Sequence, residues 1–194
     1  MKTIIYFFEF LVIIILFIIF KIIGYKSASN LGCYIGKIIG PKFRSKKLII
    51  ENIRKFKTSI DNNEINKIIN KMWGNYGRIL AEYPYISNFR KKKLENYLEI
   101  EGMHNLEIIK KNKKPVIFIS GHFNNFELMA MIIEREGINL SAVYRPLINK
   151  FLNKVMEYLR TNFICKKQIK KGLNGLREAL KHFKNGNSLA IMID

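Results

Sequence analysis

The amino-acid sequence predicts an α/β fold, in which an N-terminal transmembrane helix precedes βαβ units that form a mainly parallel sheet with flanking helices. The first observation is an almost wholly apolar segment at residues 4–23. The second is a set of short apolar runs that alternate with segments of helical periodicity. The third is the short links between them, which are typical of parallel strands joined by helices. We therefore predict a transmembrane anchor at 1–24, a basic juxtamembrane connector at 25–60 and an α/β domain at 61–194.

The N-terminal segment IIYFFEFLVIIILFIIFKII, Ile4–Ile23, has the length of a membrane span. About 20 apolar residues cross the hydrocarbon core of a bilayer. Glu9 lies near one end of the segment, where its carboxylate can reach the interface. A cleaved signal peptide is the alternative, because the Ser-Ala-Ser at 27–29 loosely resembles a cleavage site. Basic residues without an acidic one follow as far as Glu51, which favours an uncleaved anchor with a cytoplasmic body.

The charge of the chain points to an anionic partner. The 194 residues carry a net charge of +19, which suits an anionic membrane surface, an acidic protein or nucleic acid. The two cysteines, Cys33 and Cys165, lie far apart and in no ligand pattern. This argues for a reducing compartment and against a disulfide framework or a structural zinc site. We predict no cofactor and no bound metal.

The connector and the first helix of the predicted domain differ in pattern. Apolar residues between glycines at 25–47 suit a segment that lies along the membrane surface. From Ile65 to Leu80, apolar residues recur at helical spacing. Asp61, with Glu64 three residues later, is a start signal for this helix, and Pro84 is its end.

Further apolar runs predict the strands and helices of the sheet. A continuous apolar run indicates a strand buried on both faces, and PVIFIS at 115–120 is the clearest case. Leu140–Tyr144 and Ser188–Ile193 are the other two such strands, and shorter ones are predicted at 96–102 and 162–165. Helices are predicted at 104–111, 127–136 and 149–161, and one more, spaced by leucines from Leu173 to Phe183, stops at Gly186.

Polar residues follow the three buried strands directly: His122, Arg145 and Asp194. The carboxyl ends of parallel strands meet at one edge of a sheet, where ligands bind. A turn at 124–125 would fold His122 back beside Glu127 in the first helical turn. Glu127 would then orient the imidazole, which leaves the second ring nitrogen as a general base. The spacing alone also fits a histidine and a glutamate placed there for structural reasons.

The segment GHFNNFE at 121–127 resembles the H-x4-D/E signature of glycerolipid-type acyltransferases. It is most similar to the lipid A biosynthesis (lauroyl/myristoyl, late) acyltransferases. The resemblance extends over nearly the whole chain, in family order, through ENIRKF, MWGNYGRILAEYP, EGMHNL, AVYRPLINKFLNKVMEYLR and KKGLNGLREALKHFKNGNSLAIMID. It implies transfer of a fatty acyl group from acyl carrier protein to a hydroxyl of a lipid A precursor, at the cytoplasmic face of the inner membrane.

The resemblance also implies roles for residues. His122 is the general base for the acceptor hydroxyl and Glu127 orients it, without a covalent enzyme intermediate. Arg145 matches a position suited to phosphate or to the developing oxyanion. Substrate-binding positions are Arg145, Asp194, Asn125 and Lys171.

The implied partners are acyl carrier protein as the donor, an anionic glycolipid as the acceptor, and the membrane. We expect no nucleic-acid partner, because the sequence has no recognisable nucleic-acid module. The implied location is the inner membrane, with a single pass and a cytoplasmic catalytic body.

The chain departs from the family at three points, one of which is RKFKTS at 54–59, where the family often carries a proline. Asn124-Asn125-Phe126 stands where the family usually has Gly-Asn-Trp. Asparagine tolerates a positive φ better than other non-glycine residues, so we expect the turn to survive. Family members also continue past the strand before Asp194. The chain thus resembles a truncated acyltransferase domain, and we expect a sheet that is incomplete at its C-terminus, with its last strand exposed as an edge and with little or no activity.

Two alternative functions stay open. One is an inactive membrane-anchored remnant of such an enzyme. The other is a phospholipid acyltransferase that acts on a lysophosphatidate. Those enzymes typically pair His with Asp and carry a Gly-Thr-Arg element that this sequence lacks.

Overall fold

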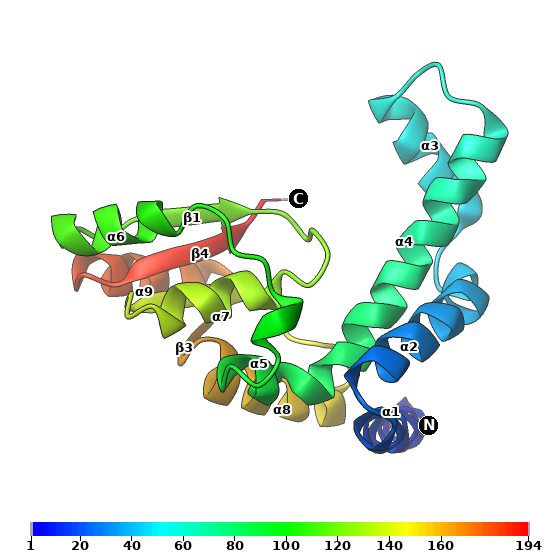
Figure 1. Cartoon of the computed structure of the whole chain (residues 1–194), viewed down its shortest axis with the longest axis horizontal. Helices are drawn as coiled ribbons and strands as arrows, with labels where there is room; N and C mark the ends of the chain where they lie inside the picture. Colours follow the sequence, from blue (N-terminus) through cyan, green and yellow to red (C-terminus); the bar gives the residue numbers. More distant parts are fainter. Residues whose placement is uncertain (1, 194) are drawn as a thin grey trace. The chain divides into compact units, whose positions relative to one another are not determined.

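A computed structural model describes residues 2–193, and within them one open sheet of four parallel strands is flanked by helices (Figure 1). The predicted α/β fold is therefore confirmed. The chain forms two compact units. One contains the residues up to Val12 and those from Ile86 onward, and the other contains Ile13–Tyr85. The apolar helix α1 (Lys2–Ile23) contributes residues to both.

The unit of residues 13–85 is helical, including the segment predicted as a connector. It contains α2 (Tyr25–Ile39), the 3₁₀ turn η1 (Gly40–Lys42), α3 (Lys46–Phe56), α4 (Asn62–Glu82) and the 3₁₀ turn η2 (Tyr83–Tyr85). Asp61 caps α4 as predicted, since its carboxylate accepts a hydrogen bond from the Glu64 amide at 2.8 Å. The helix ends just before Pro84, also as predicted.

Glycines allow α2 and α4 to pack with their backbones in contact. Gly32 and Gly36 face Gly77, and Gly40 faces the indole of Trp73. A Cβ atom on Gly77 would lie 2.0 Å from the carbonyl oxygen of Gly32. No side chain fits into such a gap, so these positions require glycine for close approach rather than for a turn.

We expect Gly77→Ala to lower the free energy of unfolding by about 1–3 kcal/mol, the usual cost of overpacking. The helix propensity of alanine offsets less than about 1 kcal/mol of this cost. Denaturant unfolding in detergent micelles measures the difference. Asn70→Ala, on the exposed side of the same helix, is the control and should stay within about 0.5 kcal/mol of the native protein. Equal stability of the two variants would contradict the close packing.

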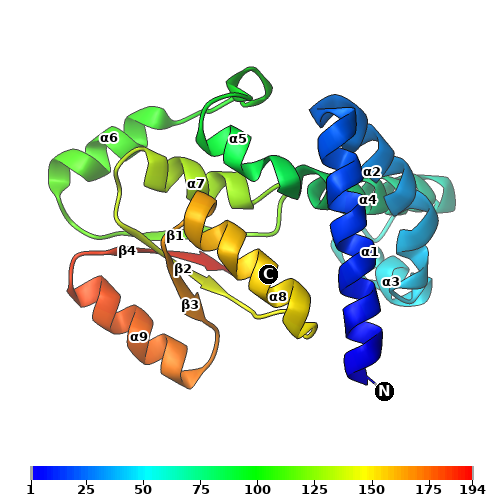
Figure 2. The ribbon, with the colours of Figure 1, turned by 90° about the horizontal axis from the view of Figure 1, so that it is seen from below.

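The other unit contains the sheet, whose strand order is β1-β4-β2-β3. Phe118 of β1 and Ala142 of β2 both lie beside Ala190 of β4, and Ala142 pairs with Gln168 of β3. Figure 2 shows α7 and α8 on one side of the sheet and α9 on the other, as right-handed crossovers require. The strands are β1 (Ile117–Ser120), β2 (Leu140–Tyr144), β3 (Lys167–Lys170) and β4 (Ser188–Met192). The helical segments are α5 (Ile86–Arg90), η3 (Glu95–Tyr97), α6 (Met103–Asn112), α7 (Glu127–Arg135), α8 (Lys150–Leu159), the π-helical turn η4 (Arg160–Ile164) and α9 (Leu173–Lys184).

Two predicted short strands are wrong. The first, at 96–102, is a 3₁₀ turn followed by irregular chain. Glu95 in this turn accepts two hydrogen bonds from Arg135 of α7, at 2.9 Å each, and they hold the pKa of Glu95 below its ordinary value. The second, at 162–165, lies largely in the π-helical turn, and the strand beyond it is the polar Lys167–Lys170. A polar strand at a sheet edge has no apolar pattern to predict it.

The positions of β1 and β4 also differ from the prediction. β1 was predicted to be buried on both faces, but it lies at an edge of the sheet, and Ile117 and Ile119 are 50% and 63% exposed. β4 was predicted to be an exposed edge, but it lies between β1 and β2. An apolar run shows that a strand belongs in a sheet, but not which neighbours it has.

Candidate active site

The carboxyl ends of the parallel strands lie at one end of the sheet, and three of the predicted site residues follow them. His122 lies in the loop after β1, Arg145 follows β2, and Lys171 follows β3. The last pairs of β2 and β3 are in register, and the Lys171 amide donates to the Tyr144 carbonyl at 2.8 Å. Arg145 and Lys171 are therefore neighbours, whereas β4 separates β1 from β2. Asp194 lies outside the described residues.

The loop after β1 follows the predicted strand-turn-helix path. Asn124 has a φ of 46°, which confirms that an asparagine supplies the positive φ here. The Phe126 amide donates to the Asn124 carbonyl at 3.0 Å, and the Leu128 amide donates to that of Asn125 at 3.1 Å. Helix α7 then begins at Glu127.

The two members of the predicted pair have different surroundings. The His122 side chain is exposed, and its ring meets the Phe126 ring edge to face at a centroid distance of 4.7 Å. Glu127 is buried, with 6% of its surface exposed. The amino-terminal end of α7 favours its negative charge. The loop therefore holds the accessible imidazole of His122 five residues before the buried carboxylate of Glu127 (127 − 122).

Arg160 binds the buried carboxylate of Glu127. Its Nε and Nη2 atoms donate to Glu127 Oε1 at 2.8 and 2.6 Å. Both side chains are largely buried, so each charge depends on the other. Arg160 is the first residue of the π-helical turn, a local irregularity that often occurs at functional sites. The sequence did not predict this residue, since it is one of 34 lysines and arginines and has no distinctive spacing.

A chain of charged and polar groups continues from Arg160 to the end of β3. The Arg160 guanidinium carbon lies 5.6 Å from the centre of the Tyr144 ring. The Tyr144 hydroxyl donates to Glu157, and this bond lowers the pKa of Glu157. Burial, followed by the Glu157 carboxylate, raises the pKa of Tyr144 above its ordinary value. Lys170 Nζ lies 3.4 Å from Glu157 Oε1. These contacts connect the buried carboxylate of Glu127 to the carboxyl end of β3.

The remaining predicted residues lie at the surface or close to it. Arg145 and Lys171 are exposed, and Asn125 is half-buried. Lys171 lines a shallow hollow of about 700 Å³ at the start of α9, together with Lys170 and Glu178. Exposed basic side chains at this end of the sheet suit a large anionic ligand better than a small enclosed one.

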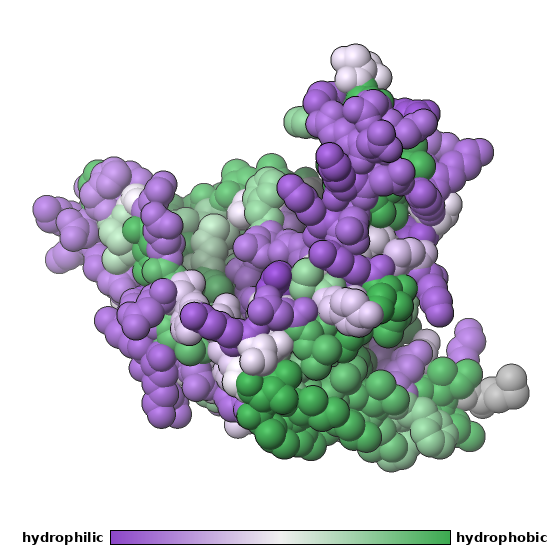
Figure 3. Space-filling view, turned by 45° about the vertical axis from the view of Figure 1, so that its right-hand side comes forward, coloured by the Kyte–Doolittle hydropathy of each residue, from purple (hydrophilic) through white to green (hydrophobic). Residues whose placement is uncertain are grey.

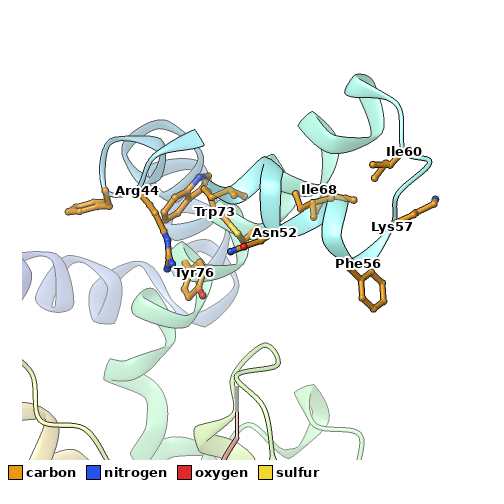
Figure 4. A pocket seen from close by; sticks show the side chains of 12 residues that line it. Arg44, Asn52, Phe56, Lys57, Ile60, Ile68, Trp73 and Tyr76 are labelled. Carbon is orange, nitrogen blue, oxygen red and sulfur yellow. The ribbon is translucent and has the colours of Figure 1, made fainter. Parts of the chain in front are cut away.

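A second hollow, of about 760 Å³, lies between α3 and α4 in the other unit (Figure 4). Its lining is mostly apolar, with Trp73 and Tyr76 from α4 and Phe56 from α3. Its charged lining residues are Arg44 and Lys57, both basic. The lining of this hollow includes no acid–base pair. We therefore place the candidate site at the carboxyl ends of the strands.

A model of the family described as bacterial lipid A biosynthesis acyltransferase matches residues 1–194. The match includes α1, the loop after β1 and α7. Comparison with curated proteins and with solved structures gave no match.

Proposed function

The chain belongs to the bacterial lipid A biosynthesis acyltransferase family, and we propose that it transfers a fatty acyl group from acyl carrier protein to a hydroxyl of a lipid A precursor. The family indicates acyltransferase chemistry in lipid A biosynthesis. The observation that carries the finer proposal is the exposed His122 on the turn that leads into the buried Glu127–Arg160 pair.

In the proposed reaction, a ring nitrogen of His122 takes the proton of the acceptor hydroxyl. At the same time, the hydroxyl oxygen attacks the carbonyl carbon of the thioester. The new C–O bond forms and the C–S bond breaks. The imidazolium then gives the proton to the departing thiolate of the carrier, so no covalent enzyme intermediate forms. Glu127 orients the ring and stabilises its positive charge, and Arg160 holds Glu127 in place.

Substrate binding is proposed at the basic strand ends. Arg145 and Lys171 are neighbours there and suit the phosphates of a glycolipid or the developing oxyanion. Asn125 in the turn and Asp194 complete the proposed set. The net charge of +19 suits both an acidic carrier protein and an anionic acceptor at the cytoplasmic face of the inner membrane.

Mass spectrometry of lipid A tests the proposal, after expression of the chain in a strain that lacks late acyltransferases. The proposed function predicts a new lipid A species, heavier by one acyl group, and none when His122→Ala is expressed at the same level, whereas the truncated domain that the sequence indicates predicts little or no activity. If the protein is in the membrane and lipid A is unchanged, the proposal fails and the inactive remnant is favoured. Acyl gain in phosphatidate alone would favour the lysophosphatidate alternative.

A further inference from the structure

The hollow between α3 and α4 has the size and the walls of a ligand pocket. Its volume is about 760 Å³, and small-molecule pockets usually measure about 300–1,000 Å³ and have mostly apolar walls. All of its lining residues belong to the unit of residues 13–85. Nine of the twelve are apolar or aromatic, and four of these nine are the aromatic residues Phe43, Phe56, Trp73 and Tyr76. The hollow therefore suits an apolar ligand.

The hollow is elongated and follows α4. In Figure 4, Arg44, Trp73 and Tyr76 lie at one end of it, and Phe56 lies at the other. Ile68 and Tyr76, which both line it, are eight positions apart on α4 (76 − 68). This separation is about 12 Å along the helix axis. An apolar hollow of this shape suits a fatty acyl chain better than a compact ligand.

The chain that forms the α3 side of the hollow is strongly basic. Residues 40–57 include seven lysines and arginines and one acidic residue, Glu51. Figure 3 shows hydrophilic side chains gathered at the top of the view, where α3 lies, with hydrophobic ones among them. Basic residues on an amphipathic helix attract anionic lipid headgroups. The ligand that matches both the walls and the charge is an amphiphile with an apolar chain and an anionic headgroup.

Two exposed phenylalanines flank α3 at the hollow. Phe43 precedes the helix and Phe56 is its last residue, and they are 79% and 95% exposed. Large apolar side chains beside basic ones are typical of helices that lie at the headgroup–acyl boundary of a membrane. The unit of residues 13–85 begins within α1, which is long and apolar enough to cross a membrane. Membrane phospholipid is therefore the amphiphile that this unit meets.

The two basic residues that line the hollow differ in their partners. Lys57 Nζ lies 2.9 Å from Glu64 Oε1, so its charge is already paired. The Arg44 side chain is exposed and forms no ion pair or hydrogen bond within residues 2–193, which the structure describes. An arginine side chain binds phosphate oxygens through two parallel N–H groups. Arg44 is thus the cation that suits a lipid phosphate at the Trp73 end of the hollow.

We propose that the hollow between α3 and α4 binds one acyl chain of an anionic membrane phospholipid, whose phosphate is bound by Arg44. The chain lies along α4 from Trp73 towards Phe56, and the two exposed phenylalanines enter the surrounding lipid. A specific lipid thus attaches α3 to the membrane surface, as a contact additional to α1. The inference does not rest on the proposed reaction, because this lipid site uses no residue of the candidate active site.

Fluorescence of Trp73 tests the proposal, because it is the only tryptophan of the chain. The full chain is reconstituted in phosphatidylcholine vesicles that contain increasing amounts of phosphatidylglycerol with bromine atoms on one acyl chain. Bromine quenches an indole that it contacts. Trp73 is only 9% exposed, so a bromine on a chain in the hollow reaches the indole more readily than one in the surrounding bilayer.

We expect quenching that saturates as brominated phosphatidylglycerol is added. Brominated phosphatidylcholine, mixed with unlabelled phosphatidylglycerol, should quench several-fold less, because the anionic lipid then occupies the hollow. Equal quenching by the two brominated lipids would show general contact with the bilayer and would overturn the proposal. Absence of quenching by either lipid would overturn it as well, and would leave the basic residues to an acidic protein or another anionic partner.

A pair of variants tests the phosphate contact. Arg44→Gln should raise the amount of phosphatidylglycerol needed for half-maximal quenching by about fivefold, the usual contribution of one basic residue near an anionic surface. Lys67→Gln is the control, since Lys67 is exposed on α4 but does not line the hollow. It should change that amount by less than about twofold. Equal shifts for the two variants would refute Arg44 as the phosphate ligand.

Discussion

Replacing His122 with alanine is expected to lower the turnover of acyl transfer by about 10²–10⁴-fold, the usual contribution of a general base. The substrate should still bind, because the proposed phosphate contacts are at Arg145 and Lys171, so KM should change much less than kcat. The exposed position of His122 predicts that the free energy of unfolding stays within about 0.5 kcal/mol of the native value. Initial rates with an acyl carrier thioester in mixed micelles, together with thermal unfolding, measure both quantities.

The same loop supplies a control for this experiment. Phe123 is the next residue and is also exposed, so Phe123→Ala perturbs the loop without removing a proton acceptor. It should retain turnover within a few-fold of the native protein. Near-native turnover of His122→Ala would refute the role of this residue as the base.

Replacing Arg160 with methionine is expected to lower the free energy of unfolding by about 3–5 kcal/mol. The change removes a cationic partner of a buried charge, and the Glu127 carboxylate loses the two hydrogen bonds from Arg160. Arg160→Lys should recover part of the loss, because a lysine supplies the charge without the paired geometry. Denaturant unfolding of the three proteins in detergent measures the series.

A double-mutant cycle separates the ion pair from simple packing. Glu127→Gln removes the charge that Arg160 binds, so the double variant Glu127→Gln/Arg160→Met should be more stable than Arg160→Met alone. It should nevertheless remain inactive, because Glu127 no longer orients His122. Strictly additive effects on stability would show that the two side chains do not depend on each other.

The sequence predicts elements whose signals are local. Asp61 caps α4 because an acidic side chain there can reach the Glu64 amide, whatever the rest of the chain does. Asn124 takes a positive φ for a similarly local reason. The apolar periods also give α7, α9 and β2 close to their observed bounds.

Features that depend on distant partners could not be predicted. From the sequence, the glycines of α2 indicate an irregular connector. In the structure they contact Gly77, which lies 45 positions after Gly32 (77 − 32). β3 is a strand because β2 offers it an edge, and its own residues are mostly polar. Arg160 is important because it donates hydrogen bonds to Glu127. Nothing in the sequence distinguishes it among the 34 lysines and arginines.

The strand order has a consequence for synthesis on the ribosome. β4 is the last of the four described strands in sequence but lies between β1 and β2. Its contacts are long-range: the Val116 amide, for example, donates to the Ser188 hydroxyl 72 positions later. The nascent chain therefore holds β1 and β2 apart, with unpaired edges, until β4 has been translated. Such non-local pairing slows folding and prolongs the exposure of unpaired apolar strands, which raises the risk that the emerging chain aggregates.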